Sequence, residues 1–110
     1  MDATNLLPLL ADPVRLALVT GLKSGERSVG DLTASAGIAQ SGVSRHLAIL
    51  HKAGVVQVRA EGQRRLYALR PEPFLALESW LDEFHSLWSA RLDRFAGALT
   101  AKQLETRDDD

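Results

Sequence analysis

The chain has no cysteine among its 110 residues. This absence excludes a disulfide framework, a thiolate metal site, a thiol redox switch and a cysteine nucleophile. No run of apolar residues approaches membrane-spanning length, and the first residues, MDATN, lack the basic region of a signal peptide. A glycine-rich phosphate-binding loop is also missing. We therefore expect a cytoplasmic protein that uses none of these chemistries and does not bind a membrane.

The composition is that of an ordinary globular protein, with 45% hydrophobic and 25% charged residues. A chain of 110 residues forms one domain with a modest core. We expect this domain to span residues 1–104. Residues 105–110 end in one arginine and three aspartates and are expected to form a flexible tail.

The net charge of -1 hides an uneven distribution. Residues 40–70 hold six basic side chains and one acidic side chain, whereas residues 71–110 hold four basic and nine acidic side chains. Charges on a solvated surface can fall unevenly by chance. A basic block of this density nevertheless favours an anionic partner for the middle third of the chain.

Two short helices are expected before this basic block. Asp12 and Pro13 are typical of a helix start, and apolar residues at positions 14, 17, 18, 21 and 22 form one helical face. Ser28 followed by Asp31 resembles a capping box for a second helix, which runs from about residue 29 to 36 and stops at Gly37.

The stretch QSGVSRHLAILHKAG, residues 40–54, follows after a turn of only three or four residues. Two helices joined by so tight a turn form a helix-turn-helix motif. Residues 55–69 contain two β-prone runs on either side of Glu61-Gly62-Gln63, which predicts a hairpin. The expected fold is therefore mainly α with a small β-hairpin, a winged helix-turn-helix.

The last segment carries apolar residues at steps of three or four. They are Phe74, Leu77, Leu81, Phe84, Trp88, Leu92, Phe95 and Leu99. A helix over about 73–104 would be roughly 48 Å long, which is more than a domain of this size needs. A kink or break could shorten it. The surplus apolar length is most simply buried against a second copy, so we predict a homodimer.

The helix beginning at Gln40 divides into two faces at 100° per residue. Val43, Leu47 and Leu50 define the buried side. The opposite side is small, polar and basic, and it consists of Ser41, Ser44, Arg45, Ala48 and Lys52. Small residues allow close approach to DNA, and an arginine can bind guanine in bidentate fashion. An ordinary solvated face is the alternative, and the turn before the helix and the arginines after it argue against that alternative.

Other basic residues extend this candidate interface. Arg59, Arg64 and Arg65 lie on the predicted hairpin and suit phosphate contact or insertion into the minor groove. His46 lies at the edge of the buried side, where it could touch a phosphate or serve in packing and hydrogen bonding. The sequence leaves both roles open for His46.

Three segments, DPVRLALVTGL, SVGDLTASAGIAQSGVSRHLAILHKAGVV and EGQRRLYAL, resemble the ArsR/SmtB family of bacterial winged-helix repressors. The resemblance covers residues 10–70 and reaches into the last helix. It implies a dimer built from the first and last helices that binds a palindromic operator, with repression relieved by a ligand. It also implies DNA contacts by Gln40, Ser41, Ser44, Arg45 and His46, and by Arg64 and Arg65 on the wing.

The sequence departs from the metal-sensing members of that family. The helix SVGDLTAS carries no thiol. Asp82 and His85 are three residues apart on the last helix and could face one metal ion, but no second histidine follows, so a solvated helix face is favoured and we expect no cofactor. Trp80 and Trp88 could line an organic-ligand pocket, although dimer core is favoured for them. An unrecognised inducer and a repressor without any ligand both remain open.

The start of the helix at Gln40 is a second departure, because many relatives place a serine where this chain has Ala39. Alanine is a poor N-cap. Either the cap shifts to Ser41, or the first turn frays until a DNA phosphate completes it.

The predicted function is a sequence-specific DNA-binding repressor, and the alternative is a winged-helix module that binds protein. That alternative needs an apolar outer face, which this sequence lacks. Enzyme activity is not expected, because Ser44 and His46 point to different faces of one helix and cannot form a nucleophile and its base.

Overall fold

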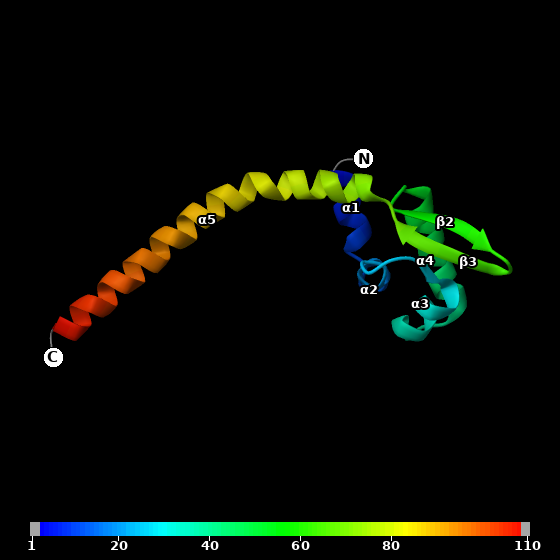
Figure 1. Cartoon of the computed structure of the whole chain (residues 1–110), viewed down its shortest axis with the longest axis horizontal. Helices are drawn as coiled ribbons and strands as arrows, with labels where there is room; N and C mark the ends of the chain where they lie inside the picture. Colours follow the sequence, from blue (N-terminus) through cyan, green and yellow to red (C-terminus); the bar gives the residue numbers. More distant parts are fainter. Residues whose placement is uncertain (1–2, 109–110) are drawn as a thin grey trace. The chain divides into compact units, whose positions relative to one another are not determined.

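The computed structural model describes residues 3–108, and the side chains of residues 5–104. The elements follow the order α1 (Ala3–Leu10), α2 (Pro13–Gly21), β1 (Arg27–Ser28), α3 (Val29–Ala36), α4 (Gln40–Lys52), β2 (Val56–Glu61), β3 (Arg64–Leu69) and α5 (Pro71–Asp108) (Figure 1). The chain divides into two units between Leu77 and Glu78. The predicted winged helix-turn-helix is confirmed, with α3 and α4 as its two helices.

Side-chain caps begin α2 and α3 as the sequence predicts. An Asp12 carboxylate oxygen accepts hydrogen bonds from the backbone N–H groups of Val14 at 2.8 Å and Arg15 at 3.1 Å. These bonds, with that from Arg15 foremost, hold the pKa of Asp12 below its usual range. The Ser28 hydroxyl accepts from the backbone N–H of Asp31 at 3.1 Å. The starts of α2 and α3 are therefore both fixed by local hydrogen bonds.

The start of α4 lacks such a cap. Ala39 is the N-cap residue, with extended backbone and no side-chain hydrogen bond, so the cap does not shift to Ser41. Gly42 in the first turn leaves room for Ile38, whose Cδ1 atom would lie 3.1 Å from a Cβ at that position. The turn before α4 thus packs tightly on the helix even though the first N–H groups have no side-chain acceptor at Ala39.

Replacing Ala39 with serine is expected to raise the free energy of unfolding by about 1 kcal/mol, because a hydroxyl would accept from an N–H of the first turn. A gain of that size raises the melting temperature by roughly 4–8 °C in a domain of this size. Thermal unfolding followed by circular dichroism measures it. Ser28→Ala, which removes the observed cap of α3, is the matched control and should lower the melting temperature. An unchanged melting temperature for Ala39→Ser would refute the prediction.

The core lies between the helices and the inner face of the sheet. Val43, Leu47 and Leu50 are fully buried, as the periodicity of α4 predicts. The predicted face of α2 is wrong in part, because Ala17 is exposed and Val19 is buried. The reason is that α2 packs against α1, α3 and α4, and these neighbours cover the side of Val19 and leave Ala17 uncovered.

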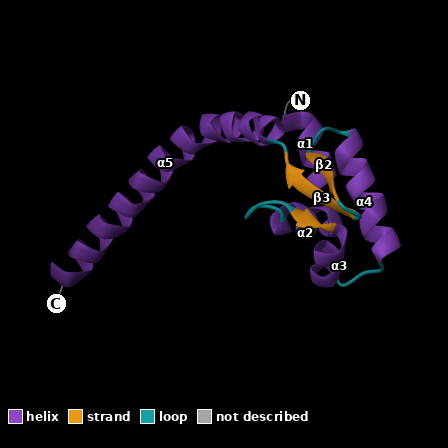
Figure 2. Cartoon of the chain, turned by 45° about the vertical axis from the view of Figure 1, so that its right-hand side comes forward, coloured by secondary structure: helices purple, strands orange, loops and turns teal. Residues whose placement is uncertain are grey.

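The wing is a three-stranded antiparallel sheet in the order β1-β3-β2 (Figure 2). Glu61 pairs with Arg64, so a two-residue turn of Gly62 and Gln63 closes the predicted hairpin. Gly62 has a φ of 61°, which glycine adopts without strain. The sequence did not predict β1, which is only two residues long and pairs with Leu66 and Tyr67.

Two helices differ from the prediction. The sequence did not predict α1, which contains Pro8 and buries Leu6 completely. The last helix, α5, is uninterrupted from Pro71 to Asp108 rather than spanning about 73–104, because prolines in a first turn lack only N–H groups that would be unpaired anyway. Residues 105–108, expected to be a tail, are helical, and residues 109–110 lie outside the described residues.

The two units of the chain use α5 differently. In the first unit Pro73 is buried, and Phe74 and Leu77 pack against the core. In the second unit all large apolar side chains from Trp80 to Leu104 are exposed in the single chain. Within the described part of this unit, no other element covers these apolar side chains.

Candidate nucleic-acid interface

The outer face of α4 is exposed as the sequence predicts. Its exposed residues are Gln40, Ser41, Ser44, Arg45, Ala48 and Lys52. His51 and Lys52 lie in the last turn, where positive charge complements the helix dipole. The division by angle therefore correctly separates the side that holds α4 to the core from the side available to a partner.

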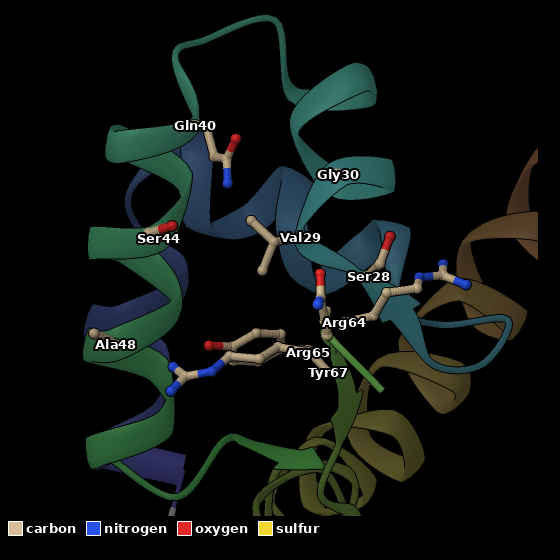
Figure 3. A pocket seen from close by; sticks show the side chains of 10 residues that line it. Ser28, Val29, Gly30, Gln40, Ser44, Ala48, Arg64, Arg65 and Tyr67 are labelled. Atoms are coloured by element: carbon tan, nitrogen blue, oxygen red, sulfur yellow. The ribbon is translucent and has the colours of Figure 1, made fainter. Parts of the chain in front are cut away.

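The outer face of α4 and the wing enclose a hollow of about 540 Å³. Gln40, Ser44 and Ala48 line it from α4, and Arg64 and Arg65 line it from β3 (Figure 3). The remaining lining residues are Ser28, Val29, Gly30, Gln63 and Tyr67. Its walls are small and polar on the helix side and basic on the wing side.

A second hollow of about 430 Å³ adjoins the later part of α4. Ala48 and His51 line it from α4, and Arg59 and Arg65 line it from the wing. Since Arg65 and Ala48 line both hollows, the helix and wing form one concave surface with Arg65 at its centre. In Figure 3 the Arg65 side chain extends toward α4.

Arg59 is held by acidic neighbours. Its guanidinium donates to the Glu26 carboxylate through Nε at 2.9 Å and Nη2 at 2.5 Å, and Nη2 also lies 3.3 Å from Glu61. The Arg59 hydrogen bond lowers the pKa of Glu26, and the same contact raises the pKa of Arg59. Two carboxylates partly neutralise this arginine, so it contributes less positive potential than its position in the sequence suggests.

Arg64 is more loosely paired. Its Nη2 atom lies 3.8 Å from the Asp31 carboxylate, and both side chains are exposed. Figure 3 shows Arg64 extending away from α4, on the other side of the strand from Arg65. A long ion pair between exposed groups is worth little, so it leaves Arg64 able to exchange Asp31 for another anion.

His46 does not lie on the outer face. It is only 9% exposed, and its Nδ1 atom is 3.4 Å from Nη1 of Arg15 on α2. The geometry favours the packing and hydrogen-bonding role that the sequence left open. Sequence reasoning missed Arg15, since the two residues are 31 positions apart and no local pattern connects them.

The second unit does not assemble a metal centre in the described part of the chain. His85 Nε2 lies 3.5 Å from the Ser89 hydroxyl, and the described residues contain no group of three His, Cys, Asp or Glu side chains that could hold a metal ion. The expectation from the sequence, that Asp82 and His85 lie on a solvated helix face and hold no metal ion, stays a prediction.

The aromatic residues of the second unit interact with near neighbours along the helix. Trp80 and Phe84 meet edge to face at 4.9 Å between ring centroids, and the Arg91 guanidinium lies 5.3 Å from the Trp88 ring centre. Among the described residues, no helix combines the length and apolar character needed to span a membrane.

A helix-turn-helix whose second helix presents small, polar and basic side chains beside a basic wing defines a winged-helix DNA-binding protein. Residues 12–58 match the model of the bacterial regulatory protein arsR family. The chain is 35% identical to the HTH-type transcriptional regulator Rv2034 of Mycobacterium tuberculosis over 97 residues, which cover 88% of each chain.

Solved structures of transcriptional regulators also resemble this chain. The transcriptional repressor BigR from Xylella fastidiosa has a TM-score of 0.59 and 42% identity over 61% of this chain and 68% of that one. The ArsR family transcriptional regulator RHA00566 has a TM-score of 0.66 and 31% identity over 78% of this chain and 89% of that one. The protein belongs to the arsR family of bacterial DNA-binding transcriptional regulators, and it is not an enzyme.

Proposed function

We propose that the protein is a homodimeric repressor that acts in the cytoplasm and binds a palindromic operator, with α4 in the major groove and the wing against the adjacent backbone. The concave surface formed by α4 and Arg65 is the observation that carries the proposal. A protein-binding winged helix would present an apolar outer face on α4. Apart from Ile49, the exposed residues of this helix are instead small, polar or basic.

The contacts divide into two kinds by position. The N-terminal part of the outer face suits base contacts, and its members are Gln40, Ser41, Ser44 and Arg45. The later part and the wing suit phosphates, and their members are Lys52, Arg59, Arg64 and Arg65. Arg59 is hydrogen-bonded to Glu26, so it would have to break or share these bonds to contact a phosphate. We therefore expect Arg59 to contribute less to DNA affinity than Arg65. Burial of His46 leaves it out of both groups.

The proposal of a homodimer rests on the apolar residues of α5. Residues 81–91, LDEFHSLWSAR, and residues 92–102, LDRFAGALTAK, form a tandem repeat of eleven residues. An eleven-residue repeat corresponds to about 3.67 residues per turn, so its apolar positions stay on one side of a helix. We call these positions the α5 stripe: Leu81, Phe84, Trp88, Leu92, Phe95 and Leu99. They are 40–62% exposed in the single chain.

An antiparallel arrangement fits this stripe. A two-fold axis at the level of Ala90 would place Trp88 beside Leu92 of the partner subunit and Leu81 beside Leu99 of the partner subunit. Residues 78–88 carry three acidic side chains and no lysine or arginine, whereas residues 89–104 carry three basic side chains and one acidic one. Antiparallel helices bring these unlike halves together, and parallel helices would bring like halves together.

Selection of duplexes from a random pool by the full chain tests the function. We expect enrichment of an inverted repeat whose half-sites are roughly 34 Å, or one DNA turn, apart. Affinity for the selected sequence should fall with salt at a log–log slope of about -0.9 for each phosphate contacted. Recovery of no preferred sequence would overturn the proposal and favour a protein-binding module.

A further inference from the structure

A partly buried polar contact joins three helices behind the outer face of α4. Arg15 on α2 is half-buried, and its Nε donates to the backbone carbonyl of Leu9 at 2.8 Å. Its Nη1 lies 3.4 Å from Nδ1 of His46 on α4. Its own backbone N–H donates to Asp12. One side chain therefore contacts the last turn of α1, while its backbone begins α2, and its tip meets the middle of the recognition helix.

The chemistry of each partner suits this arrangement. Leu9 lies in the last turn of α1, where carbonyl oxygens lack partners within the helix and carry the negative end of its dipole. A guanidinium has only donors, so Nδ1 of His46 must be the unprotonated acceptor in this contact. The Asp12 carboxylate is the acidic group beside this pair, since it accepts a hydrogen bond from the backbone N–H of Arg15.

The contact acts on the orientation of α4. Val43, Leu47 and Leu50 hold the helix to the core through apolar packing, which tolerates small shifts. A directional hydrogen bond at His46 constrains rotation of the helix about its axis. Arg45, the next residue along the chain, is on the exposed face. Specific contacts require that face to be held within about 0.5 Å and 10–20°.

We propose that Arg15 and His46 are positioning residues for operator recognition, which link α1 and α2 to α4 and contact no DNA themselves. The inference rests on the proposed function, because it needs a preferred DNA sequence to be read. It assigns to His46 a role behind the interface, in place of the direct contact that the family resemblance implies.

The test compares full-length variants on two probes, the duplex selected from the random pool and a scrambled duplex of equal length. His46→Leu keeps the bulk and removes the acceptor, and Arg15→Lys keeps the charge but cannot reach both Leu9 and His46. Each should lower affinity for the selected duplex about tenfold, the cost of one hydrogen bond to a charged group, and leave the scrambled duplex within about twofold. His46→Asn, whose oxygen can replace Nδ1, should restore most of the affinity.

The double variant Arg15→Lys/His46→Leu should lose no more than either single variant, because both remove the same contact. The proposal would be overturned if the affinity losses of the two single variants multiply in the double variant, or if a variant loses affinity equally for both duplexes. It would also be overturned if His46→Asn lowers affinity for the selected duplex as much as His46→Leu does. Should His46→Leu fail to fold, judged by its melting temperature, Arg15→Lys and His46→Asn still decide the matter. Failure of the selection itself would instead overturn the proposed function.

Discussion

Replacing Trp88 with glutamate is expected to convert the proposed dimer into monomers and to lower operator affinity by a factor of roughly 10²–10⁴. Trp88 lies at the middle of the α5 stripe and is 52% exposed in the single chain. On dimerisation a carboxylate there would lose water among the apolar side chains of the α5 stripe, and this desolvation is costly even with Arg91 nearby. Each monomer would then bind one half-site alone and lose the advantage of two linked contacts. Sedimentation equilibrium and operator titration measure the two effects.

The opposite face of α5 provides the control. Ala90 is exposed and lies about 200° around the helix from Trp88 at 100° per residue. Ala90→Glu adds the same charge at the same level and should leave both the dimer and operator affinity unchanged. If Trp88→Glu sediments as a dimer, the α5 stripe is not the dimer interface. DNA binding by the first unit would stand independently of that outcome.

The absence of cysteine makes the helix orientation measurable in the same experiment. Antiparallel pairing predicts that Leu81→Cys and Leu99→Cys each give no cross-link alone, because like positions would be about 27 Å apart along the axis. A chain with both substitutions should form a covalent dimer on oxidation, within the short Cα separation that a disulfide allows. Cross-linking of Leu81→Cys with itself would indicate parallel helices and contradict the proposed pairing.

The features that the sequence revealed are those with a local pattern. Periodicity over the thirteen residues of α4 separates Val43, Leu47 and Leu50 from the exposed face, and the structure confirms that division. Side-chain caps at Asp12 and Ser28 were also predictable, because each cap needs only residues within three positions. Local physics is enough for these elements.

The features that the sequence missed depend on distant partners or on very short segments. Arg15 meets His46 and Glu26 meets Arg59 across more than thirty positions, and no spacing rule indicates such pairs. Strand β1 has two residues and exists because β3 provides hydrogen-bond partners. Helix α1 contains a proline and is stabilised by burial of Leu6 in a core formed largely by later elements. Tertiary packing decides all of these.

Arg45→Ala and Arg64→Ala are expected to weaken DNA binding in different ways. Arg45 is on the outer face of α4, where a bidentate contact with guanine is worth about 1–3 kcal/mol per half-site. Its loss should lower affinity for the selected operator far more than affinity for scrambled DNA. Arg64 lies on the wing and is only loosely held by Asp31. Because Arg64 is proposed to contact a phosphate, its loss should lower affinity for both duplexes alike. It should also reduce the salt slope by about one unit per contact.

Lys23→Ala is the charge control for this pair, since Lys23 is exposed and lies in the segment after α2, outside both hollows beside α4. Removing its charge should change neither the ratio of the two affinities nor the salt slope appreciably, because a single surface charge distant from the phosphates is screened at ordinary ionic strength. Equal losses on the two duplexes for Arg45→Ala would show that Arg45 contacts the backbone. The base contacts would then have to come from Gln40, Ser41 and Ser44, the uncharged residues at the start of the same face.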